Sequence, residues 1–415
     1  MNIASNPIWF VEPQTGYQIN STAISADGSV CLLGTSREYD SGQFAVYCYD
    51  SNKNLLWSKP ITDSEVYQGV FWVAVSANGQ YGAAGGIKKT QTSGTKKAVR
   101  LIARDDSEST DNGFLNIYDM STGENLLALS CASRVNQVAM SDDGSTLVAV
   151  AGSEVILCQK VGGDFERVAV EDLGSQYGQS CQLSADGCHA VVGTTNYDEN
   201  KDNGYTGQVL TYSTANQTLT QTALYQADVG IQRVALCSDS SWWAASTHSG
   251  QLFAFSANVK SGSLPVWTFT PDDKDVSLSY AVAIGRKDEV VYFTLGVNLH
   301  SENAGGRLYT MQCQASSPEG SMPTPCWQHD ITYGVNPGVN MDRNAEYVTA
   351  TDGQPGSKSD KDESAGDFYL FKVNDNSNPL LWSYKTDQMN WPMSISANGN
   401  AIFGASDNGY AYFWA

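Results

Sequence analysis

The sequence is poor in basic residues. Of its 415 residues, 24 are Lys or Arg and 44 are Asp or Glu, so the formal net charge is −20 and the pI is near 4.4. A protein that neutralises phosphates or docks on anionic lipid needs a basic surface. We therefore expect no nucleic-acid partner and no docking on anionic membranes.

Long hydrophobic runs are also missing. The longest apolar run covers residues 70–75, whereas a membrane-spanning helix needs about 20 such residues. We expect no membrane span. Residues 1–6 lack the charged and apolar regions of a signal peptide, which favours a cytoplasmic location. A processed N-terminus would leave a periplasmic or secreted location open.

The usual catalytic motifs are not found. The sequence has no Gly-x-Ser-x-Gly elbow, no His-Glu-x-x-His and no phosphate-binding loop. It contains four histidines, of which His248 and His300 fall in predicted loops beside Ser249 and Glu302. These two are candidate catalytic side chains, and the alternative is that they are solvated loop residues.

What the chain does contain is typical of β-structure. Charged residues make up 16% of the sequence, against about 25% in an average globular chain. Glycine (38), Tyr (21) and Trp (10) are plentiful. This composition fits short strands joined by glycine-bearing turns, so we predict an all-β fold.

An internal repeat decides the architecture. Eight segments share an apolar–small–apolar pattern that runs into a polar or glycine-bearing turn, as in Val73-Ala74-Val75-Ser76-Ala77-Asn78-Gly79. We take the fourth residue of each segment as its anchor, and successive anchors are about 53 residues apart on average. The anchors are Ser25, Ser76, Ser141, Ser184, Cys237, Gly285, Asp342 and Ser396.

Each repeat has room for four short strands. The anchor is followed by a second apolar run, then by a strand ending in aromatics, then by a strand that carries Leu-Trp, as at Leu56-Trp57. Four strands in about 50 residues, repeated, are typical of a β-propeller blade. We predict an eight-bladed β-propeller of four-stranded antiparallel blades. The alternative is seven blades, if Gly285 or Asp342 is not a true anchor.

The two ends of the chain predict how the ring closes. Pro7-Ile8-Trp9 matches the fourth-strand segments Pro265-Val266-Trp267 and Pro325-Cys326-Trp327, whereas the chain ends on a third-strand pattern at residues 410–414. An N-terminal strand that completes the last blade would remove exposed sheet edges. We expect one propeller domain over residues 1–415, with the strand at about 7–11 paired to the blade at about 391–415.

The junctions between third and fourth strands carry a family resemblance. Tyr118-Asp119-Met120-Ser121-Thr122-Gly123-Glu124 and the segment from Tyr49 to Trp57 resemble the repeat of pyrroloquinoline-quinone-type propellers, and the Ala-Asp-Gly turns are similar to those of WD40-like and lactonase-like propellers. The resemblance implies a propeller fold, in a superfamily that includes both dehydrogenases and non-enzymatic scaffolds. The chain has no adjacent Cys-Cys pair, so we do not expect a bound quinone.

The loops between second and third strands are long and variable, so we place any site on their face, around the mouth of the axial channel. At the start of each first strand lie amides, aromatics and two arginines, which suit a sugar, a peptide or an anionic small molecule. The alternative is that these side chains satisfy exposed strand ends. Together with the two loop histidines, the candidate ligand-binding residues are Asn20, Arg134, Asn136, Gln179, Gln232, Arg233, Tyr280, Trp391, His248 and His300.

The same loops space oxygen-bearing side chains two residues apart. Asp198-x-Asn200-x-Asp202 and Asp360-x-Asp362 resemble the opening of a calcium-binding loop, because Ca²⁺ takes six to eight oxygen ligands. The competing interpretation is ordinary turn chemistry, in which Asp or Asn precedes Gly. We keep Asp198, Asn200, Asp202, Asp360 and Asp362 as candidate Ca²⁺ ligands.

The nine cysteines leave the redox compartment open. Cys31 with Cys48, and Cys313 with Cys326, are placed where each pair would face across a hairpin, so an oxidising compartment would allow disulfides. Reduced buried thiols are the other interpretation, favoured by the absence of a signal segment.

These observations lead to two hypotheses for function. The first is a non-catalytic, monomeric binding or scaffold propeller, which holds a protein, peptide or glycan on the long-loop face. The second is an enzyme with its site over the axial channel, either a quinone- or metal-assisted oxidoreductase or a carbohydrate-active lyase or hydrolase. The second requires Arg134, Arg233, His248 and His300 to converge.

Overall fold

The computed structural model is built almost entirely of β-strands. It describes residues 3–88, 113–198, 204–257, 264–272, 276–299, 305–334, 338–354 and 365–415. Within these residues there are 32 strands and one short 3₁₀ helix, Ala215–Gln217. No described helix has the length and apolar character needed to cross a bilayer. The predicted all-β propeller of four-stranded antiparallel units is confirmed.

The strands form four-stranded units that follow one another along the chain. The first four units are β2 (Gln18–Ile24), β3 (Val30–Gly42), β4 (Ala45–Asp50) and β5 (Leu55–Pro60); β6 (Val66–Val75), β7 (Tyr81–Ile87), β8 (Gly113–Asp119) and β9 (Asn125–Cys131); β10 (Val135–Met140), β11 (Thr146–Ala151), β12 (Glu154–Val161) and β13 (Asp164–Asp172); and β14 (Tyr177–Leu183), β15 (His189–Tyr197), β16 (Tyr205–Ser213) and β17 (Thr220–Ala227).

Four more units complete the described chain. They are β18 (Ile231–Leu236), β19 (Trp242–Thr247), β20 (Leu252–Ser256) and β21 (Trp267–Phe269); β22 (Val276–Lys287), β23 (Val290–Leu299), β24 (Gly306–Gln314) and β25 (Thr324–Ile331); β26 (Val339–Met341), β27 (Tyr347–Thr351), β28 (Gly366–Lys372) and β29 (Leu380–Thr386); and β30 (Asn390–Ile395), β31 (Ile402–Ser406), β32 (Ala411–Trp414) and β1 (Trp9–Val11). The described strands therefore fall into eight four-stranded units, numbered one to eight from the unit of β2.

The N-terminal strand closes the ring. β1 pairs antiparallel with β32, with Trp9 opposite Phe413 and Val11 opposite Ala411. The two aromatic rings stack at 4.9 Å. Unit eight is thus assembled from both ends of the chain, and β1 covers the edge of β32 that would otherwise be unpaired.

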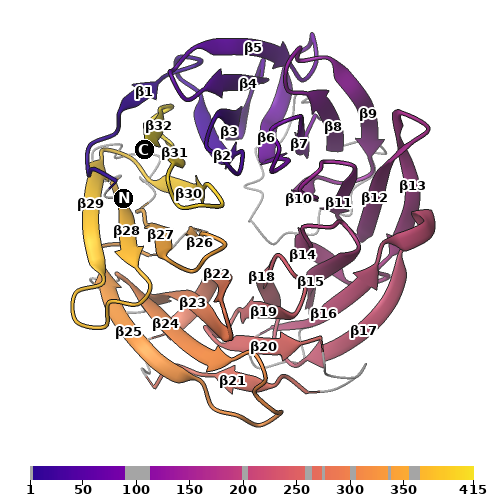
Figure 1. The fold of residues 1–415 in the computed structure, drawn as a ribbon. Helices are drawn as coiled ribbons and strands as arrows, with labels where there is room; N and C mark the ends of the chain where they lie inside the picture. The colour runs from indigo at the N-terminus through magenta and orange to yellow at the C-terminus, as the bar shows by residue number, and fades with distance from the viewer. Residues whose placement is uncertain are drawn as a thin grey trace.

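The units are arranged like blades around a common axis (Figure 1). The inner strands, β2, β6, β10, β14, β18, β22, β26 and β30, lie nearest the axis, and the fourth strands lie at the rim. Units one and two also share direct pairing between β3 and β6, with Ser36 opposite Gly69. All strand pairs within the units are antiparallel, so the start of each inner strand lies at the same end as the loop between second and third strands.

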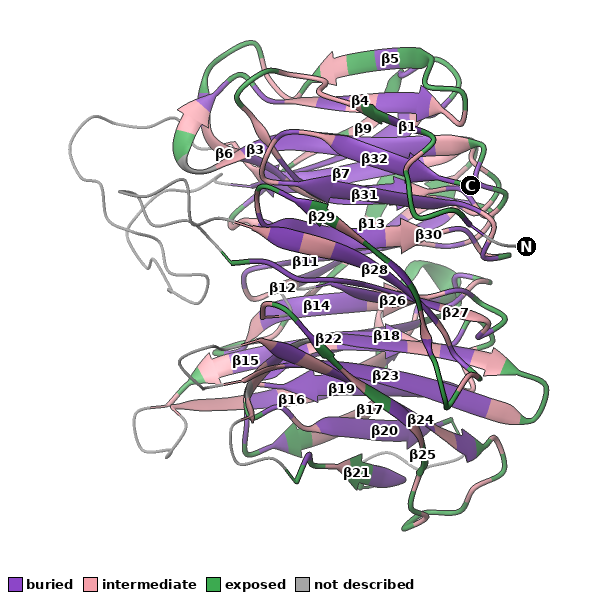
Figure 2. Ribbon diagram, turned by 90° about the vertical axis from the view of Figure 1, so that its left-hand side faces the viewer, coloured by how far each residue is buried: buried purple, intermediate pink, exposed green. Residues whose placement is uncertain are grey.

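The core lies between neighbouring units rather than at one centre. Figure 2 shows buried residues running along the strands, with exposed residues at the turns and on outer strands such as β5. In β5 only Trp57 is buried, because alternate side chains of a rim strand face solvent. Each hydrophobic cluster combines side chains from adjacent units. One example joins Leu32 and Val46 of unit one to Val73 and Ala84 of unit two.

The fourth-strand tryptophans connect one unit to the next. Four of these indole N–H groups donate to a backbone carbonyl in or beside the following unit, which satisfies a buried donor and helps fix the spacing of the units. Beneath the Trp57 ring lies Gly123, where a Cβ would come within 2.7 Å of the indole. The pairs are Trp57 with Met120 O (2.8 Å), Trp327 with Val373 O (2.9 Å), Trp382 with Ile3 O (3.0 Å) and Trp9 with Ser51 O (2.8 Å).

The anchor residues form the turns between first and second strands. In unit one, the Ser25 hydroxyl donates to Asp27 and accepts the Val30 amide, which fixes the turn. These contacts and the Ser29 amide hold the pKa of Asp27 below its usual range. The carboxylate stays ionised at neutral pH, and its Oδ1 accepts three hydrogen bonds within its own turn.

These turns also bond to one another around the axis. The Ala26 amide donates to Ala77 O at 2.9 Å, and the Asp142 amide donates to Ala185 O at 2.9 Å. Corresponding bonds join units two and three, four and five, seven and eight, and eight and one. Backbone bonds between tight turns therefore help hold the inner edges of the units together.

The prediction that two pairs of cysteines face each other across hairpins is wrong. Cys31 lies opposite Tyr49 and Cys48 lies opposite Leu32, so the two thiols point to opposite faces of their sheet and pack in different clusters. Cys313 and Cys326 likewise pack in the clusters on the two sides of unit six. The one-residue offset in register separates each pair. None of the nine cysteines is part of a disulfide.

Candidate functional site

The candidate residues at the starts of the inner strands lie at irregularities of the sheet. The register of β2 shifts between Ile19 and Ser21, which places Asn20 in a β-bulge. The same shift in β6, β10, β14 and β18 places Phe71, Asn136, Gln179 and Gln232 in bulges. A bulge leaves one residue out of the pairing and redirects its side chain. The sequence predicted that these residues lie at the starts of the inner strands, and the structure places them there, but the sequence did not predict the bulges.

Arg134 is held in a defined orientation immediately before β10. Its Nε donates to Asn136 Oδ1 at 2.7 Å, and its guanidinium lies 4.3 Å from the centre of the Phe71 ring in the neighbouring unit. Asn136 is fixed in turn, because its Nδ2 donates to Gly178 O at 2.7 Å. Three successive units thus position one guanidinium group.

Arg233, on β18, lies over the aromatic residue that follows Phe71 in the sequence. Its guanidinium lies 5.5 Å from the centre of the Trp72 ring, and Nη1 donates to Gln232 O at 3.0 Å and to Gln179 O at 3.4 Å. Trp72 belongs to unit two and Arg233 to unit five, which are not neighbours in the ring. Units three and four lie between them in the ring, so the contact joins two units that are not adjacent.

We call Phe71, Trp72, Arg134, Asn136 and Arg233 the arginine–aromatic cluster. Both aromatics and both arginines are partly exposed, whereas Asn136 is buried. Cations held over aromatic faces are stabilised by the ring quadrupole. The cluster places two positive charges at the inner ends of the units in a chain whose net charge is −20.

Buried amides lie at the starts of the same or neighbouring inner strands. Gln232 is 2% exposed, Gln137 is 3% exposed and Asn20 is 6% exposed. In each of them one polar atom, Gln232 Nε2, Gln137 Oε1 or Asn20 Oδ1, has no hydrogen-bond partner. A buried polar group without a partner is costly, so such atoms mark places where water or a ligand supplies the missing bond.

The other candidates at the ring axis are not brought into the cluster. Trp391 is buried, and its Nε1 donates to Asp407 at 2.6 Å within unit eight. The side chain of Tyr280 lies outside the described part of the structure. Trp72, Gln137 and Tyr177, whose hydroxyl is 3.5 Å from Asn136 Oδ1, were missed as candidates. Trp72 and Gln137 are each four residues before an anchor, and that position was the available signal.

The histidine required by the enzyme hypothesis packs elsewhere. His248 stacks on Tyr205 of β16, with ring centres 4.3 Å apart and planes at 3°. Its amide donates to Gly230 O at 2.9 Å. Burial lowers the pKa of His248 to about 4, so the imidazole is neutral near pH 7. His300 lies outside the described residues.

The candidate calcium ligands fall almost entirely outside the described residues, which include Asp198 but not Asn200, Asp202, Asp360 or Asp362. The amide of Asp198 donates to Gly204 O at 3.0 Å. Within the described chain, no three His, Cys, Asp or Glu side chains form a group able to hold a metal. The calcium site stays a prediction.

A second contact crosses the ring at the opposite end. Arg343, in the first turn of unit seven, forms a two-pronged ion pair with Asp142, in the first turn of unit three. Units three and seven lie on opposite sides of the ring (Figure 1). The pair therefore spans the axis on the face of the tight turns.

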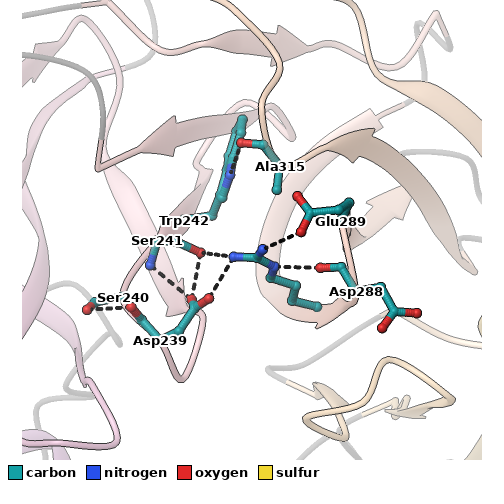
Figure 3. Close-up of polar contacts among 8 residues, drawn as sticks. Asp239, Ser240, Ser241, Trp242, Asp288, Glu289 and Ala315 are labelled. Carbon is teal, nitrogen blue, oxygen red and sulfur yellow. Dashed lines mark hydrogen bonds and ion pairs between the residues drawn. The ribbon is translucent and has the colours of Figure 1, made fainter.

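A fourth arginine, Arg286, shows full pairing for comparison. Oxygens of Asp239, Ser241, Asp288 and Glu289 surround the Arg286 guanidinium (Figure 3), with distances from 2.8 Å to Asp239 up to 3.6 Å to Glu289. This arginine joins the turns of units five and six. Its two carboxylate partners neutralise it, which marks it as a structural residue.

Comparison with solved structures supports the fold. No family model matches the sequence, and no curated protein matches it. Three solved propellers are similar to this chain over 99–100% of its length. The chain has a WD40-like propeller fold.

The three propellers differ widely from this chain in sequence. They are the C-terminal WD40 domain of Sif2 (TM-score 0.61, 14% identity, 98% of that chain), the Dos1 propeller (0.63, 11%, 94%) and Chaetomium thermophilum Sqt1 bound to the N-terminus of ribosomal protein L10 (0.65, 11%, 99%). At such identities the likeness concerns the fold alone. The resemblance to quinone-type propellers stays a prediction.

Proposed function

We propose that this protein is a non-catalytic binding propeller that holds a segment of another protein at the starts of its inner strands. The arginine–aromatic cluster carries the proposal. It assembles side chains from units two, three and five, so it exists only in the folded ring, and its arginines and aromatics are partly exposed. Tyrosine, tryptophan and arginine are the residues that most often dominate protein interfaces.

The fold supports the same proposal. A rigid ring with loops of variable length is a common scaffold for binding. Among the similar structures, Sqt1 is bound to the N-terminus of ribosomal protein L10, so a propeller of this shape can hold a polypeptide segment. The structure gives less support to the enzyme hypothesis, since the His248 ring stacks on Tyr205 and is neutral near pH 7.

Site-specific photo-crosslinking tests the proposal. We would replace Phe71 with p-benzoylphenylalanine and irradiate the protein in extracts of cells that naturally contain it. Phe10 is the matched control position, because it lies on β1 at the rim and is 50% exposed. We expect a discrete cross-linked partner from position 71 that excess unlabelled protein displaces, and none from position 10.

Two results would contradict the proposal. One is the absence of a displaceable partner at position 71, or equal labelling from both positions. The other is turnover of a small molecule that is lost in the Arg134→Gln variant, which would favour the enzyme hypothesis.

A further inference from the structure

The arrangement around Arg134 leaves part of its guanidinium unused. Its Nε is bonded to Asn136 and one face covers Phe71, so the group is fixed in plane and direction. Its Nη1 and Nη2 carry four N–H donors, and one from each nitrogen points along the edge between them. No described carboxylate forms an ion pair with Arg134, in contrast to Arg307 with Asp330 and Arg343 with Asp142.

The surroundings favour a negative group at this edge. The second guanidinium, that of Arg233, is held over the adjacent residue Trp72. Two cations thus lie on consecutive aromatic residues, and both attract a negative group. Gln137 follows Asn136 on β10, and Gln232 precedes Arg233 on β18. Each of these two amides has one atom without a hydrogen-bond partner, and that of Gln232, Nε2, is a donor.

We propose that the arginine–aromatic cluster binds a carboxylate of the partner polypeptide, with Arg134 as the principal ligand. The planar edge of a fixed guanidinium matches the two oxygens of a carboxylate. A carboxylate is favoured over a phosphate group because the net charge of −20 penalises each additional negative charge on a ligand. This inference rests on the proposed function and names the chemistry that the site recognises.

The arginine Nε–Hε signals in a ¹⁵N NMR spectrum provide the test, and Arg134→Gln and Arg233→Gln assign the two signals. The probes are the capped peptides acetyl-Ala-Glu-Ala-amide and acetyl-Ala-Gln-Ala-amide, acetyl-Ala-Ala-Ala with a free carboxyl terminus, and inorganic phosphate. We expect saturable shifts of the Arg134 signal with either carboxylate peptide and at least fivefold weaker binding of the Gln peptide.

Variants separate recognition from folding. Arg134→Gln should weaken binding of the Glu peptide at least fivefold, and Arg134→Lys should weaken it less because the charge remains. Arg167→Gln is the matched control, since Arg167 is exposed on the outer strand β13, and it should bind as the wild type does. Thermal unfolding verifies that each variant is folded.

Three results would overturn the inference. They are equal binding of the Glu and Gln peptides, unchanged binding in Arg134→Gln, and binding of phosphate at lower concentration than either carboxylate. If these occur while Phe71 still cross-links a partner, the carboxylate assignment fails and the proposed function stands. If the cross-link is also absent, both fail.

Discussion

At the residue scale, burial against Tyr205 decides the protonation state of His248. Because its pKa is lowered from 6.5 to about 4, the unfolded chain takes up a proton at this histidine between these two pH values and the folded chain does not. Its contribution therefore favours folding above pH 6.5, and it is lost as the pH falls toward 4.

We predict that the free energy of unfolding falls less steeply with decreasing pH in a His248→Phe variant than in the wild type. The difference in slope should approach, but not exceed, about 1.4 kcal/mol per pH unit, which is the value for one proton. Urea unfolding at pH 7, 6 and 5 measures this difference. Parallel curves for His248→Phe and the wild type would refute the prediction.

Residue-level chemistry was only partly accessible from the sequence. Asn136, Gln179 and Gln232 were identified because each lies five residues before an anchor, and Arg134 and Arg233 because they lie close to these positions. Their partners could not be identified in the same way, since Trp72 meets Arg233 across two intervening units. Such a contact depends on the curvature of the ring, which no local pattern encodes.

At the element scale, one ionic network joins units six and seven. Glu346, just before β27, accepts hydrogen bonds from Lys287 of β22 and from Lys372 of β28, the latter at 2.7 Å. These two lysines lower the pKa of Glu346 from 4.5 to about 2. The stabilisation is therefore present above pH 4.5 and is lost as the pH falls through about 2.

We predict that Glu346→Gln lowers the free energy of unfolding at pH 7 by about 0.5–1 kcal/mol, because the carboxylate is partly exposed and screened by solvent. The difference from the wild type should shrink between pH 4.5 and pH 3. Urea titrations at pH 7, 5 and 3 measure it, with Glu319→Gln in an exposed turn as the control. A difference that is constant with pH would show that the charge is not responsible.

The positions of the strands and turns were predicted better than the register in which the strands pair. The repeats located the inner strands and the tight turns, because the apolar–small–apolar pattern and the Ser-x-Asp turn are local signals. The bulges were missed because an extra residue does not disturb that pattern. The facing of Cys31 and Cys48 was wrong because a one-residue offset reverses the face to which a side chain points.

At the scale of the whole molecule, stability depends on closing the ring through β1. Trp9 is 7% exposed, packs on Phe413 and bonds to Ser51 O of unit one. A single side chain therefore joins the N-terminal strand to unit eight and to unit one. The repeat pattern alone predicted this strand's partner, since the segment at Trp9 matched the fourth strands.

We predict that Trp9→Ala destabilises the protein by about 3–5 kcal/mol, the usual cost of removing a buried Trp. Phe10→Ala, on the adjacent and half-exposed position, should cost much less. Equilibrium unfolding in urea compares the two. Equal losses would show that closure through Trp9 is not a major source of stability.

The claim that joins these scales is that the starts of the inner strands form a binding site. The most direct measurement is the dissociation constant of the partner captured at position 71, determined by calorimetry for the wild type, Arg134→Gln and Arg167→Gln. We predict at least tenfold weaker binding for Arg134→Gln, equivalent to about 1.4 kcal/mol, and wild-type binding for Arg167→Gln. Equal dissociation constants for all three proteins would contradict the account.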